Sequence, residues 1–369
     1  MRVGLAFILC LQMACFLMTG DVATAGPLDV RHVPADAQWL IHVDCETSRT
    51  SPFGQTVFEQ MFGGRRSKVY LSRIKNQLGI DVATDLKSIT LFDTRFQRHH
   101  GLVMLRAAGL DADKIVASLK QRHEETSEHF YRGHTLYTWL RGKGKKNEHE
   151  VTGCLHGDDT VLVSRDVDVL KRTLEVLDGK SESLAAASPL AKPVAAGEMV
   201  SVRTRRIVGR ELPFRSPLTQ QSEMFTMALG EQDGNVFVHA HLETKSDEVA
   251  DQLHDIVEGF RALAMLRHGS DEAGKRVFAG LTVAVEGQTL TADWKMLPAD
   301  AHKMLQIMHE HRKQQHRHRG HHHDRRKRAK DMKPAKQRPS PDDASKTQPK
   351  ATPDEDAATT SARTISKDS

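Results

Sequence analysis

Apolar and polar residues alternate from Val236 to Glu243, which predicts a β-strand with one buried face. A helix is predicted to follow, because Ser246 suits the N-cap and the acidic pair Asp247 and Glu248 suits the positive end of the helix dipole. Apolar residues at helical spacing mark the side of this helix that is expected to face the core, namely Val249, Leu253, Ile256, Val257, Phe260, Leu263 and Ala264.

Residues 281–296 predict a β-hairpin. Alternating apolar residues lead from Leu281 into a turn at Gly287, and the return strand alternates in the same way as far as Met296. Pro298 is expected to open a last helix, because the first turn of a helix tolerates its missing N–H.

A similar order of elements is predicted earlier in the chain. It comprises strands at 39–43, 89–91, 102–105 and 136–140, a helix capped by Asp111, a hairpin at 151–164 and a helix capped by Asp166. We therefore predict an α+β fold of tandem duplicated units, each a mostly antiparallel sheet covered on one face by helices. The alternative is two dissimilar α+β halves whose likeness comes from generic alternation.

The N-terminus has the features of a secretory signal peptide. Arg2 precedes an apolar run from Val3 to Met18, and Ala23-Thr24-Ala25 supplies the small residues expected before a cleavage site. A membrane anchor and a lipoprotein site at Cys15 are the alternatives. The predicted organisation is a signal peptide at 1–25, a first repeat at 26–183, a linker at 184–197, a second repeat at 198–313 and a tail at 314–369.

Residues directly after the signal peptide carry a resemblance to a known group of proteins. The segment from His32 to Gln55 contains Val-Pro-Ala-Asp-Ala-x-Trp-x-x-His-x-Asp and then Ser-Pro-Phe-Gly-Gln. It resembles the start of uncharacterised exported proteins of planctomycete-type bacteria. The resemblance implies export to the periplasm or the exterior, and it carries no functional residue over to this chain.

Positive charge is concentrated in the C-terminal part of the chain. The whole sequence has 53 Lys and Arg against 48 Asp and Glu, but residues 309–338 alone hold 12 basic against 3 acidic side chains. The rest is close to neutral. Beyond Gly320 the chain has too few apolar residues to offset the entropy of ordering it, so we expect a disordered tail.

The tail supplies two candidate sites. Its histidines are expected to chelate a divalent transition metal weakly, and they are His309, His311, His316, His318, His321, His322 and His323. Its cations are expected to attract anionic polymers, and they are Arg312, Lys313, Arg317, Arg319, Arg325, Arg326, Lys327 and Arg328. No other cofactor is predicted.

Metal and redox chemistry elsewhere in the sequence is weakly indicated. His239 and His241 share one strand face and are candidate ligands, although the sequence provides no third ligand beside them. The acidic pair at Asp158 is explained by the backbone needs of a turn. Two cysteines, Cys45 and Cys154, remain after the signal peptide, either as a disulfide or as buried thiols.

The sequence contains no Gly-x-Ser-x-Gly, His-Glu-x-x-His or Rossmann glycine motif. It therefore favours an exported, non-enzymatic binding or structural protein of the cell envelope, with a partner that is an anionic polymer or another protein and with no transmembrane span after signal cleavage. The alternatives are an enzyme whose site is assembled from scattered residues, and a structural body carrying a metal-buffering tail.

Overall fold

A computed structural model describes residues 28–305 except residues 63, 97–99, 143, 145–147, 193–196, 206–220 and 269–271. The chain divides into two compact units, Met1–Glu310 and His311–Ser369, and every described residue belongs to the first. The predicted signal peptide and the whole of the predicted tail lie outside the described residues.

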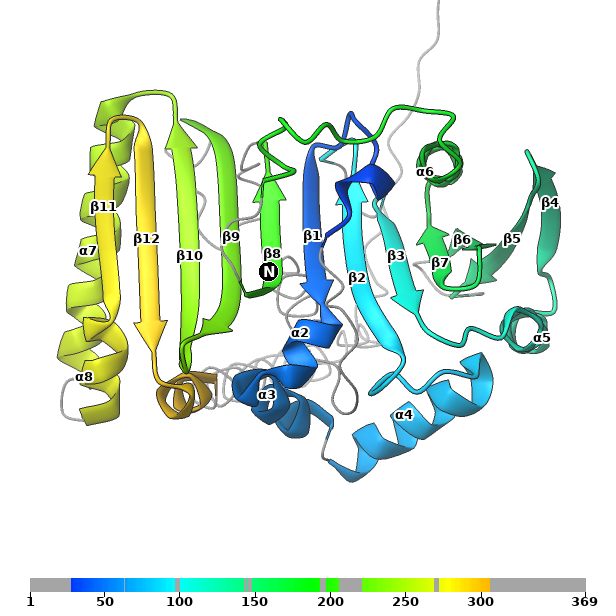
Figure 1. Ribbon diagram of the computed structural model, residues 1–369, viewed down its shortest axis with the longest axis horizontal. Helices are drawn as coiled ribbons and strands as arrows, with labels where there is room; N and C mark the ends of the chain where they lie inside the picture. The colour runs from blue at the N-terminus through cyan, green and yellow to red at the C-terminus, as the bar shows by residue number, and fades with distance from the viewer. Residues whose placement is uncertain are drawn as a thin grey trace, which may run out of the picture. The chain divides into compact units, whose positions relative to one another are not determined.

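Twelve strands form one sheet in which every neighbouring pair is antiparallel (Figure 1). Its order is β11-β12-β10-β9-β8-β1-β2-β3-β7-β6-β5-β4. The bounds of the strands are β1 Trp39–Asp44, β2 Leu86–Asp93, β3 Leu102–Ala107, β4 Ser127–Tyr131, β5 His134–Arg141, β6 His149–His156, β7 Thr160–Ser164, β8 Glu198–Thr204, β9 Ser222–Gln232, β10 Asn235–Thr244, β11 Leu281–Glu286 and β12 Thr289–Met296.

The two halves of the sequence therefore share one sheet, and they join where β1 pairs with β8. Outward from this seam, the first half runs β1-β2-β3-β7-β6 and continues with β5 and β4. The second half runs β8-β9-β10-β12-β11. In each half, three strands that are consecutive in the sequence are followed by a hairpin. The second strand of that hairpin lies closer to the seam than its first strand.

Helices occupy the connections between the strands. They are η1 Val30–His32, α2 Cys45–Thr50, α3 Pro52–Phe62, α4 Arg65–Leu78, α5 Ala112–Arg122, α6 Val167–Leu177, α7 Asp247–His268 and α8 Glu272–Ala279. A further helix begins at Pro298 and continues at least to Leu305. The predicted caps are present, since the carboxylates of Asp111 and Asp166 accept hydrogen bonds from backbone N–H groups in the first turns of α5 and α6.

The core of the first half lies under α6. Its buried members include Leu136 and Cys154 from the sheet, Leu170 and Leu174 from the helix, and Leu190. Leu190 belongs to the stretch predicted to separate the two halves, and it is fully buried. Leu190 is therefore part of the packed body, as is Leu184 of the same stretch.

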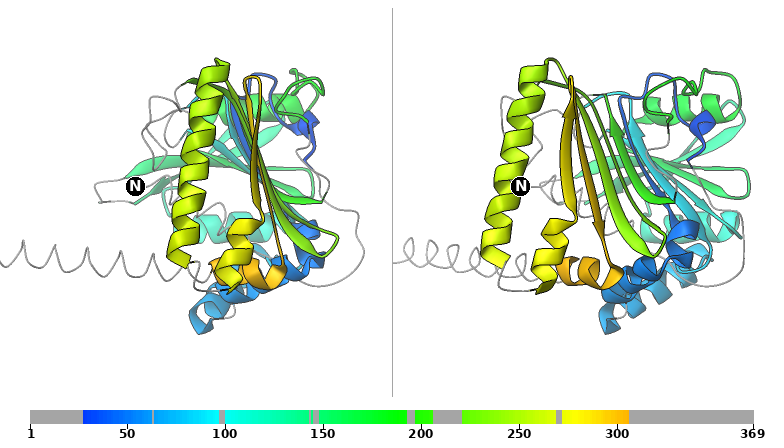
Figure 2. Two further views of the ribbon diagram at one scale, coloured as in Figure 1. Left: turned by 90° about the vertical axis from the view of Figure 1, so that its left-hand side faces the viewer. Right: turned by 60° about the vertical axis from the view of Figure 1, so that its left-hand side comes forward.

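Helices lie on both faces of the first half, which differs from the predicted single covered face. Leu136 points towards α6, whereas the adjacent Tyr137 borders a groove beside α5. Successive side chains of a strand point to opposite faces, so α5 and α6 lie on opposite sides of the sheet. In the second half, α7 runs along one face beside β10, β11 and β12 (Figure 2).

The apolar stripe predicted for α7 is only partly used for packing. Val249 and Leu253 are buried against the sheet, as predicted. Phe260 and Leu263 belong to the same stripe but are 54% and 63% exposed. Within the described residues, no helix is both long and apolar enough to cross a membrane.

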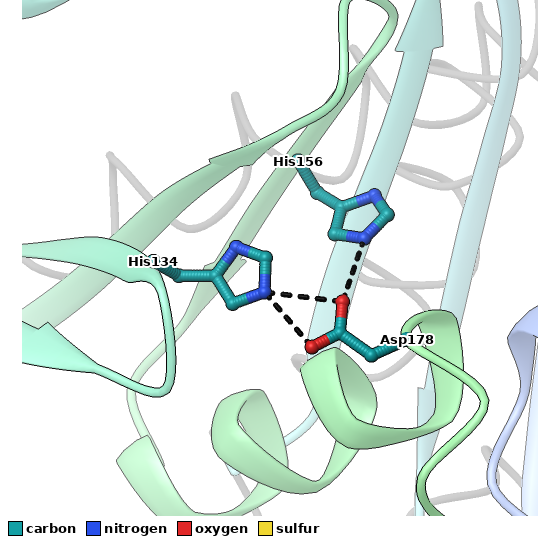
Figure 3. Close-up of side chains that lie close together, drawn as sticks. All are labelled: His134, His156 and Asp178. Carbon is teal, nitrogen blue, oxygen red and sulfur yellow. Dashed lines mark hydrogen bonds and ion pairs between the residues drawn. The ribbon is translucent and has the colours of Figure 1, made fainter.

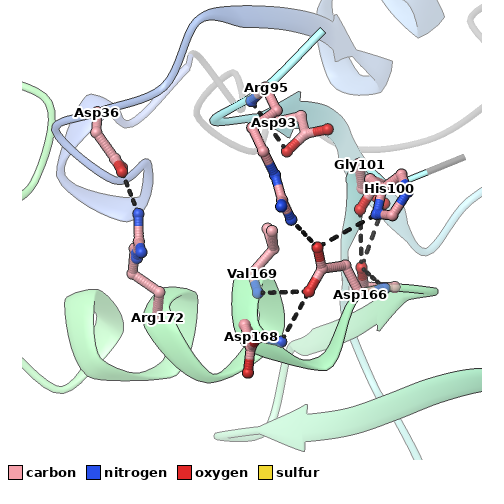
Figure 4. Close-up of polar contacts among 10 residues, drawn as sticks. Asp36, Asp93, Arg95, His100, Gly101, Asp166, Asp168, Val169 and Arg172 are labelled. Atoms are coloured by element: carbon pink, nitrogen blue, oxygen red, sulfur yellow. Dashed lines mark hydrogen bonds and ion pairs between the residues drawn. The ribbon is translucent and has the colours of Figure 1, made fainter. Parts of the chain in front are cut away.

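A polar network connects the start of α6 to Arg95, which follows β2, and to His100, which precedes β3 (Figure 4). The Asp166 carboxylate contacts the Arg95 guanidinium and the His100 imidazole while it caps the helix. Nearby, Asp93 is fully buried, and its Oδ2 atom has no hydrogen-bond partner among the described residues. Burial raises the pKa of Asp93, because an ionised carboxylate loses its hydration there.

Candidate metal centre

Three side chains that can ligate a metal meet beside the end of α6: His134, His156 and Asp178 (Figure 3). The His134 Nε2 atom lies 3.1 Å from both oxygens of Asp178, and the His156 Nε2 atom lies 3.3 Å from Oδ1. The ligand atoms all lie within 4.8 Å of one another, and all three residues are half-buried. Among the described residues, this is the one such group of three or more His, Cys, Asp or Glu side chains.

A tight turn positions His134. β4 and β5 are joined by a turn whose central residues, Arg132 and Gly133, both have positive φ angles, 48° and 98°. This is the backbone pattern of a two-residue hairpin turn that matches the twist of its strands. Tyr131 pairs with His134 across this turn, so His134 stands at the first position of β5.

The next hairpin positions His156 in the same way. His156 ends β6 and pairs with Thr160 of β7 across a turn that starts at Gly157, whose φ is 59°. β5 and β6 pair with Leu136 opposite Cys154, and the same register brings His134 and His156 together two residues further on. Their ring centroids are 5.4 Å apart.

Asp178 comes from α6, where it is the C-cap residue. Its carboxylate therefore lies at the negative end of the helix dipole, which favours a cation over an anion at this point. Packing fixes the helix above the hairpins, because Leu170 and Leu174 are buried against Leu136 and Cys154.

A second contact holds the β4–β5 turn against α6. The Tyr131 hydroxyl donates to Glu175 Oε1 at 2.6 Å, and the Arg132 guanidinium lies 2.8 Å from the same oxygen. His134 is two residues from Arg132, so these contacts also hold its backbone near Asp178. Because two hairpins and a helix each contribute one ligand, the geometry depends on tertiary packing.

Electrostatics at the site favour the ionised carboxylate. The pKa of Asp178 falls to about 2, mainly because Lys180 donates a hydrogen bond to it, with further contributions from His134 and His156. The Lys180 ammonium lies 2.8 Å from Asp178 Oδ2. Asp178 is thus a carboxylate that contacts cations or hydrogen-bond donors on each oxygen.

The donor set fits a borderline divalent transition metal. Two imidazole nitrogens and one carboxylate oxygen are ligands that Zn²⁺, Cu²⁺ and Ni²⁺ accept. Tetrahedral Zn²⁺ with bonds of about 2.0–2.1 Å requires ligand atoms roughly 3.3 Å apart. The N···O separations from the two imidazoles to Asp178 Oδ1, 3.1 Å and 3.3 Å, are close to that value, and the ligand atoms all lie within 4.8 Å of one another. A fourth position would be left for water or another ligand.

The ligands predicted from the sequence lie elsewhere. The tail histidines, from His309 to His323, and the tail cations, from Arg312 to Arg328, are outside the described residues. On β10, His239 Nδ1 contacts the Asp293 carboxylate, whereas His241 Nδ1 lies 3.5 Å from the Thr291 hydroxyl. The two histidines thus contact different neighbours on β12.

The remaining candidates have structural contacts. The Asp159 carboxylate lies 2.6 Å from the Arg106 guanidinium and has no metal-ligating partner among the described residues. Cys45 and Cys154 are both buried free thiols, in separate parts of the core, so they do not form a disulfide. Burial raises the pKa of Cys154 to about 11, which keeps its thiol protonated and unreactive.

Sequence reasoning missed the candidate metal centre because its residues are not neighbours in any motif. His134 and His156 each adjoin a hairpin turn, and Asp178 ends a helix. The available signal was the register of β5 and β6. Extending the predicted strand 136–140 by two residues would have placed the two histidines opposite each other.

A groove of about 480 Å³ lies between α5 and β5. Its walls include small and apolar residues of the helix, such as Ala117, together with Lys120, Tyr137 and the His134 position. Lys120 forms an ion pair with Glu128 at 2.5 Å. The groove therefore adjoins the strand that carries His134.

Comparison with known proteins adds little. No protein-family model matches the chain, and no curated protein matches it. Solved structures of TP0453, a treponemal protein, are similar at low TM-scores. Crystal form III is 9% identical, with a TM-score of 0.42, and the match covers 75% of this chain and 98% of that one. Crystal form IV is 10% identical, with the same TM-score of 0.42.

Proposed function

We propose that this chain is an exported metal-binding protein whose body holds one divalent transition-metal ion at His134, His156 and Asp178. The observation that carries the proposal is the convergence of these three ligands from three separate elements, with their ligand atoms within 4.8 Å of one another. The negative end of α6 adds a favourable field for the cation.

The proposed role is binding rather than catalysis. Three protein ligands would hold the ion and leave one position open, which permits exchange with a small ligand or with another carrier of the metal. Imidazole ligands favour Zn²⁺, Cu²⁺ and Ni²⁺ over Mg²⁺ and Ca²⁺, which prefer oxygen. This function deepens the metal-buffering alternative that the tail suggested, and it moves the specific site into the folded body.

Zinc titration of the full mature chain tests this proposal. All seven tail histidines would first be replaced by glutamine, so that calorimetry measures the body alone. We expect one equivalent of Zn²⁺ to bind, and we expect His156→Gln to abolish that equivalent. His254→Gln, on α7 and outside the proposed site, is the matched control and should leave binding unchanged. Absence of a saturable equivalent in the parent chain would refute the proposal.

The basic tail supports a second function, the binding of anionic envelope polymers. Residues 309–338 hold 12 basic against 3 acidic side chains, a density that attracts phosphate or sulfate groups by charge. Full-length chain and a variant with the eight tail cations from Arg312 to Arg328 changed to glutamine would be compared on immobilised heparin. We expect the variant to elute at much lower salt. Equal elution of the two proteins would contradict tail binding.

Export is the third part of the proposal, and it rests on the first 25 residues and on the resemblance at His32 to Gln55. Cleavage is expected after Ala25, so the mature envelope protein would begin at Gly26. N-terminal sequencing of protein recovered from its native envelope tests this expectation. A mature chain beginning at Met1 would instead support the membrane-anchor alternative.

We further propose that the two halves arose by tandem duplication. The matching strand orders β1-β2-β3-β7-β6 and β8-β9-β10-β12-β11 support this origin. The first half would then carry β4 and β5 as an insertion, and the insertion contributes His134. Superposition of the corresponding strands tests the proposal, and a common path for the five strands is expected.

A further inference from the structure

We propose that Lys180 competes with the metal at Asp178, so that the charge of the Lys180 ammonium opposes a divalent ion and binding of the ion favours release of the ammonium. This inference rests on the proposed metal-binding function. It assigns to Lys180 the role of setting the affinity of the site and of keeping the bound ion exchangeable.

The backbone after α6 brings Lys180 back towards Asp178. Gly179 adopts a left-handed conformation with φ of 70°, and this reverses the chain directly after the C-cap. The Lys180 N–H then donates to Glu175 O at 2.7 Å, and the Ser181 N–H donates to the same oxygen at 3.1 Å. These bonds satisfy helix-end carbonyl groups and fix the direction in which the Lys180 side chain leaves the backbone.

The Lys180 ammonium contacts the carboxylate group that would ligate the metal. Its Nζ atom lies 2.8 Å from Asp178 Oδ2, and that oxygen is 3.1 Å from His134 Nε2. A divalent ion bonded to either oxygen of this carboxylate would come close to the ammonium, and two cations at such a distance repel each other. The charge of the ammonium therefore opposes a divalent ion bound at this carboxylate.

Displacement of Lys180 needs no rearrangement of the core. Its side chain is 48% exposed, whereas Asp178 is only 16% exposed, so the ammonium can turn into water while the carboxylate stays in place. The other nearby cation, Arg132, contacts Glu175 rather than Asp178. Lys180 is therefore the residue whose charge opposes the metal directly.

Competition of this kind lowers affinity without changing the ligands. An exposed charged hydrogen bond is weak, so its removal should strengthen metal binding by about three- to tenfold. A site tuned in this way suits an ion that is taken up and passed on. A site whose Lys180 merely stabilised the ligands would behave in the opposite way, because its loss would weaken binding.

The test measures Zn²⁺ affinity by calorimetry in the full mature chain with glutamine at the seven tail histidines. We expect Lys180→Gln to lower the Kd about three- to tenfold and Lys180→Arg to stay near the parent, since arginine keeps the competing charge. Lys192→Gln, at an exposed position outside these contacts, is the matched control. The absorption of bound Co²⁺ would confirm that each variant keeps the same ligands.

The outcomes separate this inference from the proposed function. If the parent chain binds no Zn²⁺ at the site, the proposed function fails, and this inference fails with it. If the parent binds and Lys180→Gln leaves the Kd unchanged or raises it, the competition is wrong while the metal centre stands. Tighter binding by Lys180→Gln, with Lys180→Arg and Lys192→Gln near the parent, supports both the metal centre and the competition.

Discussion

The Glu231 carboxylate in the second half of the chain accepts a hydrogen bond from the backbone N–H of Phe53 in the first half, at 2.9 Å. The same oxygen contacts the Ser51 hydroxyl, so a side chain of β9 caps the N-terminus of α3. The acidic group complements the positive end of that helix. It also ties the two halves together away from the β1–β8 seam.

We expect Glu231→Ala to lower the free energy of unfolding by about 1–2 kcal/mol, which is the usual effect of losing a helix cap. Glu223→Ala is the matched control, because Glu223 lies on the same strand and is exposed. Urea denaturation of both variants measures the difference. Equal stability of the two variants would show that the cap contributes nothing.

Removing the buried Arg203 side chain is expected to destabilise the protein by about 3–5 kcal/mol, because it breaks a buried ion pair with Glu198. Arg203 is 1% exposed, and its guanidinium donates to Leu190 O and to Glu198. The check is a double-mutant cycle in urea with Arg203→Met and Glu198→Gln. Adding Glu198→Gln to Arg203→Met should recover part of the loss, whereas strictly additive effects would contradict the pairing.

Asp93 should make stability depend on pH. Its pKa is raised in the folded state, so the folded chain retains a proton that the unfolded chain releases near pH 4. Stability from this group is therefore fully present below that pH and declines as pH rises towards the folded pKa. Asp93→Asn removes the effect.

Urea midpoints between pH 3.5 and 7 measure this effect, with Asp168→Asn at an exposed position as the control. The advantage of Asp93→Asn over the parent should grow as pH rises. A constant difference across the range would show that Asp93 does not titrate differently in the two states.

Two leucines in helices should respond very differently to truncation. Leu170 of α6 is fully buried, so Leu170→Ala is expected to cost about 2–5 kcal/mol of stability. Leu263 of α7 is 63% exposed, and Leu263→Ala should change stability by no more than about 0.5 kcal/mol. Thermal and urea unfolding would measure both. A large loss at Leu263 would mean that the outer stripe of α7 is covered.

Strands with a regular alternation were predictable from sequence. The alternation from Val236 to Glu243 and the hairpin at 281–296 correspond to β10, β11 and β12, because one face of each is apolar and the other polar. The caps at Asp111 and Asp166 were also predicted correctly, since capping depends on residues a few positions apart.

Elements with weak local signals were not predicted. β4, Ser127–Tyr131, is an exposed edge strand, so it has no apolar face to reveal it. α4, Arg65–Leu78, is rich in charged and polar residues and was missed for a similar reason. The extent of packing along α7 also escaped prediction, because periodicity marks an apolar side but does not show whether anything covers it.

The metal centre required information that no short window contains. His134 and His156 are brought together by strand register, and Asp178 joins them only because α6 packs over the hairpins. The joining of both halves in one sheet was also not predictable from any short window of the sequence. The pairing of β1 with β8 links residues far apart in the sequence, such as Val43 and Val200.

That β1–β8 pairing has a consequence for how the chain folds. The other strand pairs close over shorter connections, the longest of which is the 52 residues between β3 and β7, whereas 153 residues separate β1 from β8. Closing the seam must order a much longer loop, and that step is entropically slower. Until it closes, β1 and β8 each expose a row of unpaired backbone groups that another molecule can capture. The time between synthesis of β1 and synthesis of β8 is therefore the interval in which this chain is most exposed to aggregation.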